Sequence, residues 1–325
     1  MELFYHDTLP AHLREASELS EMQRLRGVGM NCGCEYTDFP LFRTAAPYSR
    51  FDHSLGAALI VWHFTEDRTQ SLAALFHDVA TPAFAHVIDF LCGDALRQEA
   101  TEAGTEDILR RSGACARLLS EWGIPLDSVC DYHRYPIADN DLPRLSADRL
   151  EYTLGNWVRF GFGTEAQARA LYADLTVAAA EDGAPELAFR HADEGECFAR
   201  AALRCSRVYV SDADRCAMQY LAELLRDALQ DGVLRRDDLM RTEREVIALL
   251  TADETYRARW LRFRALHATA PQPPHYAFVR SIPAKKRWID PLVVGRGRVS
   301  ALSPAFRAEA ERFLALDLSV PVSAE

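Results

Sequence analysis

Two short stretches carry the first signal in this chain, Arg50-Phe51-Asp52-His53 and Phe76-His77-Asp78-Val79. They offer two imidazoles and one carboxylate, from His53, His77 and Asp78, as metal ligands. A fourth ligand is expected from Asp148, in Leu145-Ser146-Ala147-Asp148. Imidazole and carboxylate together suit a borderline divalent metal, and such sites leave positions open for water or substrate. The sequence therefore predicts one metal site built from segments that lie far apart in the chain.

Length, composition and charge narrow the class of protein. With 325 residues, of which 49% are hydrophobic, the chain can bury a large core. The formal net charge of −11 makes polymeric nucleic acid an unlikely partner, because proteins that wrap it need a basic surface. A small phosphorylated ligand needs only a few well-placed cations, so it remains compatible with this charge.

The N-terminal segment and the cysteines indicate a cytoplasmic protein. The first residues lack a basic region followed by an apolar run, so we expect no signal peptide. No apolar stretch is long enough to span a membrane. The eight cysteines are scattered, and Cys32-Gly33-Cys34 is interpreted as a loop rather than a metal motif.

Hydrophobic periodicity predicts a helical protein. Apolar residues recur at three- and four-residue steps in four segments, about 52–64, 70–78, 83–96 and 105–119. The pattern stays helical from residue 164 to about residue 266. Ser146 is expected to cap the helix that carries Asp148.

The composition changes after Ala270. A proline-rich linker comes first, followed by expected strands at 276–280 and 288–294 and a short helix near 304–316. We therefore predict an all-α protein: a helical domain over residues 1–270, with the metal site within 50–160, and a small β-containing, basic appendage over 271–325.

The appendage contains a local basic patch in this acidic chain. Its cations are Lys285, Lys286, Arg287, Arg296 and Arg298. Two interpretations stay open: a solvated hairpin edge, or a flap that faces a phosphate or another subunit.

Four motifs together resemble one known family. They are Arg50-Phe51-Asp52-His53-Ser54-Leu55-Gly56, Leu75-Phe76-His77-Asp78-Val79, Pro82-Ala83-Phe84-Ala85-His86 and Asp148-Arg149-Leu150-Glu151-Tyr152. They resemble the HD-domain phosphohydrolases, and among them the deoxynucleoside triphosphate (dNTP) triphosphohydrolases, which include the SAM-and-HD proteins. The likeness covers about residues 18–160 and continues more loosely beyond. It implies an HD-domain helical core and a homodimer or higher oligomer.

The resemblance also implies a ligand set and a cofactor. His53, His77, Asp78 and Asp148 would hold one divalent transition metal (Mn, Fe, Zn, Co or Ni, with Mg as an alternative). Such a metal polarises a phosphoryl oxygen and lowers the pKa of bound water, which gives a nucleophile near neutral pH.

Four further residues match substrate-binding positions of the family. Arg50 and Arg149 match arginines that contact phosphate, and Tyr152 matches a residue that packs on the sugar. Asn156 stands where the family more often has an aspartate that hydrogen-bonds a sugar hydroxyl.

One matched position departs from the family. The branch carries a catalytic histidine after the third helix, where this chain has Thr101. A threonine hydroxyl cannot exchange protons near pH 7 as imidazole can. The candidate substitutes are Glu102, His86 and His133.

Three classes of function stay open. The first is a metal-dependent phosphohydrolase acting on a nucleotide or similar small phosphate ester, by triphosphate release or by removal of one phosphate. The second is an HD-fold protein that binds a nucleotide or metal without turnover, which the Thr101 departure favours. The third is an HD-type di-iron oxygenase, which needs His86 and His133 as further ligands.

Overall fold

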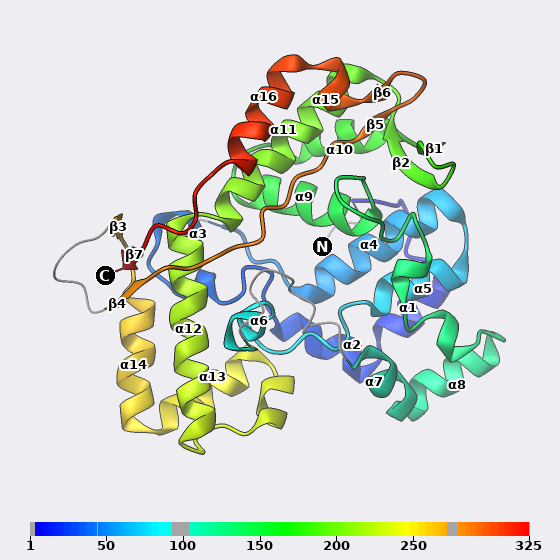
Figure 1. Ribbon diagram of the computed structural model, residues 1–325. Coiled ribbons are helices and arrows are strands. Elements are labelled where there is room, and N and C mark those ends of the chain that lie inside the picture. The colour runs from blue at the N-terminus through cyan, green and yellow to red at the C-terminus, as the bar shows by residue number, and fades with distance from the viewer. Residues whose placement is uncertain (1–3, 44, 93–103, 272–277, 325) are drawn as a thin grey trace.

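Helix α4 (Arg50–Thr65) forms the frame of the site together with α5 (Arg68–Phe76) and α9 (Ala147–Arg159), against which it packs. The computed structural model describes residues 4–43, 45–92, 104–271 and 278–324. Helices make up most of these residues, which confirms the predicted all-α class (Figure 1).

Each of these three helices begins at a side-chain cap. The Ser49 hydroxyl accepts a hydrogen bond from the Asp52 amide, and the Asp52 carboxylate accepts one from the Ser49 amide, so a capping box starts α4. Asp67 caps α5. Ser146 accepts from the amide of Arg149, which confirms the predicted cap of α9.

The remaining helices surround this frame. They are α1 (Ala11–Ser17), α2 (Ser20–Arg24), α3 (Pro40–Arg43), α6 (Val87–Cys92), α7 (Thr105–Arg111), α8 (Gly113–Glu121), α10 (Glu165–Ala173), α11 (Ala192–Tyr209), α12 (Asp212–Gln230), α13 (Glu243–Ala252), α14 (Glu254–Arg264), α15 (Val299–Leu302) and α16 (Pro304–Leu314). Short 3₁₀ helices lie at η1 (Leu25–Gly27), η2 (Cys34–Tyr36), η3 (Leu126–Ser128), η4 (Tyr132–Arg134) and η5 (Arg236–Met240). Among the described helices, none is both long and apolar enough to cross a membrane.

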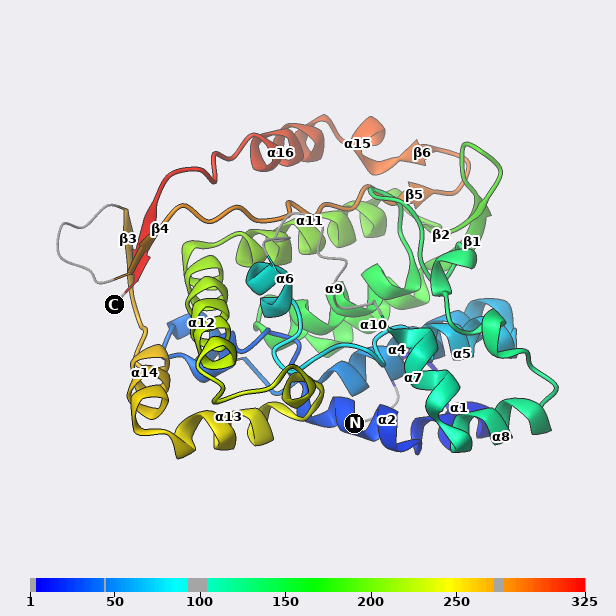
Figure 2. The same cartoon turned by 60° about the horizontal axis from the view of Figure 1, so that its bottom comes forward.

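Two small sheets lie at opposite sides of the helical body (Figures 1 and 2). One has the order β1-β2-β5-β6, from β1 (Leu175–Ala179), β2 (Pro185–Phe189), β5 (Leu292–Val293) and β6 (Gly297–Arg298). The other has the order β3-β7-β4, from β3 (Thr269–Pro271), β7 (Val322–Ala324) and β4 (Phe278–Arg280). The pair β2–β5 is parallel and every other pair is antiparallel.

The hairpin β1–β2 corrects the prediction of continuous helix over residues 164–266. Leu175 continues the apolar spacing of α10, which made the segment look helical. The chain instead turns at Gly183, whose φ is +84°, and Leu175 pairs with Phe189. Thr176 and Val177 are β-branched and fit a strand, and Asp182-Gly183 is a hairpin signal.

Two predicted helices and one predicted strand have different bounds. The helix expected over 83–96 begins only at Val87, because Phe84 and Ala85 adopt left-handed conformations with φ of 64° and 46°. Residues 93–96 lie outside the described part. The helix expected over 105–119 is divided at Ser112, which ends α7 and caps α8. In the strand expected over 288–294, only Leu292–Val293 pairs.

A second hydrophobic cluster joins the C-terminal segment to α11. Ala199 and Leu203 of α11 pack there with Val293, Phe306 and other buried residues of the C-terminal segment. Phe306 has no solvent exposure. The docking of residues 292–314 therefore rests on apolar burial against the helical region.

We expect Phe306→Ala to lower the free energy of unfolding by about 3–5 kcal/mol, because it opens a cavity in this cluster. Chemical denaturation measures the change. Leu316→Ala is the matched control, since Leu316 is 39% exposed, and should change stability by less than about 0.5 kcal/mol. Equal small losses in both variants would show that the segment does not dock as described.

Candidate metal centre

His53 and His77 present one ring nitrogen each to the same point. His77 follows directly after α5, and its Nδ1 lies 2.7 Å from the carbonyl oxygen of Ala74. A carbonyl only accepts, so Nδ1 carries the proton and Nε2 turns its lone pair to the cluster. His53, in the first turns of α4, has its Nδ1 2.6 Å from Oε2 of Glu151 and its Nε2 2.9 Å from Oδ1 of Asp148.

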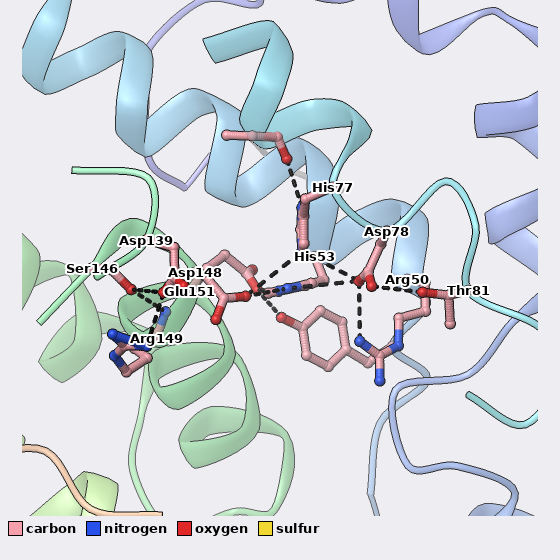
Figure 3. Close-up of polar contacts among 12 residues, drawn as sticks. Arg50, His53, His77, Asp78, Thr81, Asp139, Ser146, Asp148, Arg149 and Glu151 are labelled. Carbon is pink, nitrogen blue, oxygen red and sulfur yellow. Dashed lines mark hydrogen bonds and ion pairs between the residues drawn. The ribbon is translucent and has the colours of Figure 1, made fainter. Parts of the chain in front are cut away.

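The four predicted ligands converge from three elements, as Figure 3 shows. His77 Nε2 lies 3.4 Å from Oδ2 of Asp78 and 3.7 Å from Oδ1 of Asp148. His53 Nε2 lies 3.9 Å from Oδ2 of Asp78. The ligand atoms of His53, His77 and Asp148 all lie within 4.8 Å of one another.

This arrangement fits a divalent cation. With metal–ligand distances of about 2.0–2.2 Å, neighbouring ligand atoms lie roughly 3–3.5 Å apart, close to the spacing found here. The donor set of two imidazoles and two carboxylates suits a transition metal. The cluster therefore could hold the expected ion, whose identity the donor set leaves open.

The Asp78 carboxylate is held in place by two hydrogen bonds from residues outside the ligand set. Its Oδ2 accepts from Arg50 Nη1 at 3.0 Å and its Oδ1 accepts from Thr81 Oγ1 at 2.7 Å. Burial alone would raise the pKa of Asp78, but Arg50 and the imidazoles of His77 and His53 hold it far below its ordinary value. Asp78 is therefore a carboxylate at any pH at which the protein would be assayed.

Glu151 is a residue at this centre for which no role was predicted. It lies one turn after Asp148 on α9, is 2% exposed and also accepts a hydrogen bond from Tyr48. A carboxylate behind a ligand histidine fixes the ring and raises its basicity. The available signal was helical spacing: positions 148 and 151 share one face of a helix.

The contacts of His53 change its protonation. Burial would lower the pKa of His53, but the hydrogen bonds to Asp148 and Glu151 outweigh burial and raise the pKa to about 10. Without metal, the imidazole therefore keeps its second proton near neutral pH and donates to both carboxylates. A cation at the centre must displace that proton.

The cluster opens into a cavity of about 460 Å³. All four metal-ligand candidates line it, and so do the substrate-binding candidates Arg50, Arg149, Tyr152 and Asn156. Cavities of this size hold small organic ligands. Arg50 is buried, and among the described residues its Nε has no hydrogen-bond partner.

The other three substrate-binding candidates have partners within the protein. Arg149 donates to Asp139 Oδ1 at 2.8 Å, to Asn140 Oδ1 at 2.7 Å and to the carbonyl of Arg144, so it braces the loop before α9. Asn156 donates to the Tyr209 hydroxyl at 2.7 Å. The Tyr152 ring lies 6.5 Å from that of His53. Their contacts with substrate remain predictions.

The acid–base candidates lie around the cluster rather than in it. His86 lines the cavity, and its Nδ1 is 2.9 Å from Asp89 Oδ2. His133 also lines it, is half exposed and lies 3.4 Å from Asp139 Oδ2. Among the described residues, the one cluster able to hold a metal contains neither histidine, so a second iron site gains no support. Glu102 and Thr101 lie outside the described residues.

We expect Glu151→Gln to weaken metal binding about 10–100-fold, because the His53 ring loses the carboxylate that orients and polarises it. Calorimetric titration of the metal-free protein measures this affinity. Glu121→Gln, on the exposed end of α8, is the matched control and should bind metal as the wild type does. Unchanged affinity in Glu151→Gln would contradict the assigned role.

Metal affinity should rise with pH between pH 6.5 and 8.5, by up to about tenfold per unit if one proton is displaced. The reason is that the pKa of His53 is about 10 in the metal-free protein, so the proton is still bound throughout this range. Titration in two buffers of different ionisation heat counts the protons released. Binding that releases no proton and does not vary with pH would refute this expectation.

Comparison with known proteins agrees with this geometry. No protein-family model matches the chain. YdhJ of Bacillus subtilis, an uncharacterized protein, is 24% identical over 251 residues, which are 74% of this chain and 71% of YdhJ. The metal-dependent phosphohydrolase cns2 of Cordyceps militaris is 27% identical over 149 residues, which are 46% of this chain and 41% of cns2.

Two solved structures share the fold. A phosphohydrolase from Bacteroides thetaiotaomicron superposes with a TM-score of 0.66 at 14% identity, covering 98% of this chain and 96% of its own. A hypothetical protein from Aquifex aeolicus superposes with a TM-score of 0.61 at 16% identity, covering 97% and 92%. The chain therefore shares the fold of a solved phosphohydrolase, which agrees with the resemblance of its His-Asp motifs to the HD-domain phosphohydrolases.

Proposed function

We propose that the protein is a divalent-metal-dependent phosphohydrolase that acts on a nucleotide or a similar small phosphate ester. The observation that carries this proposal is the convergence of His53, His77, Asp78 and Asp148 at the wall of a cavity that also contains Arg50. The name of the relative cns2 supports the reaction class.

The metal and the residues around it would have different roles in the reaction. A bound divalent cation would supply Lewis acidity and an activated water. Arg50 places a permanent positive charge against Asp78 and lines the cavity, so its guanidinium could bind a phosphoryl oxygen. This combination favours a substrate that brings negative charge to the cluster.

His86 is the best-placed acid–base group among the described candidates. Burial lowers the pKa of His86 to about 4, and the charges of Arg50 and Arg287 act in the same direction. The hydrogen bond with Asp89 acts in the opposite direction but is outweighed. With this pKa, His86 is a neutral imidazole at neutral pH, and because Asp89 accepts from Nδ1, the ring lone pair is on Nε2. A phosphate bound nearby would raise the pKa of His86 and favour proton transfer to or from the reacting oxygens.

The nucleotide part of the proposal rests on the cavity wall and on the family resemblance. Aromatic side chains of Phe42, Phe90, Tyr132, Tyr152 and Phe160 line the cavity together with the polar groups. Such rings can stack on a flat base or pack on a sugar. The choice between releasing triphosphate and releasing a single phosphate depends in part on the segment that carries Thr101, so dNTP triphosphohydrolysis remains a proposal.

The test is turnover with a matched pair of variants. Metal-free wild type receives Mn, Fe, Zn, Co, Ni or Mg with dAMP or dATP, and phosphate and triphosphate are quantified. We expect metal-dependent release of phosphate or triphosphate, and we expect its rate to fall more than about 100-fold in Asp148→Asn. Loss of a metal ligand should reduce activity more than loss of a residue that only supports a ligand. Asp237→Asn, which is exposed and outside the cavity, should retain full activity.

Two outcomes would overturn the proposal. Tight nucleotide binding without release under any metal would assign the protein to the binding class. Two irons per chain with oxygen uptake would assign it to the oxygenase class.

A further inference from the structure

Residues 281–291, which we call the strap, connect the two small sheets. They run without regular secondary structure from β4 to β5. Figures 1 and 2 show the strap in orange, passing from the side of α12 and α14 to the side of β1 and β2. Its middle forms part of the cavity wall, through Ala284, Lys285 and Arg287.

The strap is anchored on both sides of the cavity. At its start, Ile282 is fully buried and its carbonyl accepts a hydrogen bond from Arg215 of α12. At its end, Ile289 is buried and the amide of Asp290 donates to the carbonyl of Pro143 at 2.8 Å. These contacts hold the intervening residues in place over the cavity.

Successive side chains of the strap have different surroundings. Lys285 and Arg287 line the cavity and are partly buried. Lys286 instead donates to the carbonyls of Leu314 and Leu316, at 2.6 and 2.5 Å, at the C-terminal end of α16. In an extended chain, successive side chains point to opposite sides. Lys285 and Arg287 therefore line the cavity, whereas Lys286 between them binds carbonyl groups at the end of α16.

Among the described residues, the strap supplies half of the arginine and lysine side chains that line the cavity. These are Arg50, Arg149, Lys285 and Arg287, and five aspartates line the cavity with them. The chain as a whole carries a net charge of −11, so an anionic substrate depends on local cations.

Arg287 lies within reach of the residues that continue the cavity from the metal cluster. Burial raises the pKa of Tyr152, Tyr209 and Asp214, and the charge of Arg287 opposes this rise in all three. All three line the cavity, and the Tyr152 ring lies 6.5 Å from that of His53. Tyr152 thus lies between Arg287 and His53, which is a metal-ligand candidate.

We propose that Lys285 and Arg287 are specificity-determining residues that bind a second anionic group of the substrate. This inference rests on the proposed function, in which the scissile phosphate lies at the metal cluster beside Arg50. The second group would be a further phosphate, so the strap would make the site prefer nucleoside di- and triphosphates over monophosphates.

The test compares dATP with dAMP in three proteins. The variant Lys285→Gln/Arg287→Gln removes the two cations that the strap adds to the cavity. The control Lys286→Gln/Arg296→Gln removes the same amount of charge from the same region but leaves the cavity wall unchanged. Lys286 contacts the end of α16, and Arg296 is exposed and outside the cavity. Glutamine keeps an N–H donor for the carbonyls that Lys286 contacts. Melting curves establish that all three proteins are folded.

We expect the cavity variant to raise KM for dATP by about tenfold or more, since hydrogen bonds to charged groups are among the stronger ones. KM for dAMP should change by less than about threefold, and the control should match the wild type with both substrates. Equal losses with dATP and dAMP, or no loss with either, would overturn the inference.

A binding measurement separates failure of this inference from failure of the proposed function. If the wild type releases no phosphate or triphosphate from either nucleotide, the proposed function fails. Calorimetric titration with dATP then decides the strap inference: weaker binding in the cavity variant alone supports it, and equal binding in all three proteins refutes it.

Discussion

The imidazole of His53, held at both ring nitrogens, is the contact on which the rest of the site depends. It joins α4 to α9 through Asp148 and Glu151, at 2.9 and 2.6 Å. Buried carboxylates are destabilising unless each has a partner, and a buried imidazole with two such neighbours keeps its proton. In the metal-free protein this proton provides the positive charge that a divalent cation would provide in the loaded one. The same contact therefore stabilises the helix pair and keeps the ligands near the positions that a metal requires.

Two glycines allow α4 and α9 to approach closely enough for this contact. A Cβ at Gly56 would lie 2.6 Å from Cγ of Glu151, and one at Gly155 would lie 2.7 Å from the Tyr48 hydroxyl. Tyr48 donates to Glu151, so both glycines make room for the same supporting group. Side chains at these two positions would push the helices apart or displace Glu151. The geometry of the metal centre is thus fixed partly by residues that carry no chemistry of their own.

The parts of the fold and site that could be predicted are those with local signals. The His77-Asp78 pair, the Ser146 cap and the helical periodicity each show in neighbouring residues. The role of Glu151 does not show in its neighbouring residues, because an acidic residue within a helix is usually at the surface. Glu151 is buried by the tertiary approach of α4. The hairpin β1–β2 was hidden for a related reason. Leu175 extends the apolar spacing of the helix before it, and only its pairing with Phe189 distinguishes strand from helix.

The charged residues of the central helices and those of the strap have different roles. The helical body places its arginines against aspartates, so that Arg50 and Arg149 fix the positions of ligands and loops. The strap adds Lys285 and Arg287 to the same cavity from a segment far away in sequence. A change in the strap can therefore alter which anions the cavity admits without disturbing the ligand geometry, whereas a change in the helical arginines alters both at once.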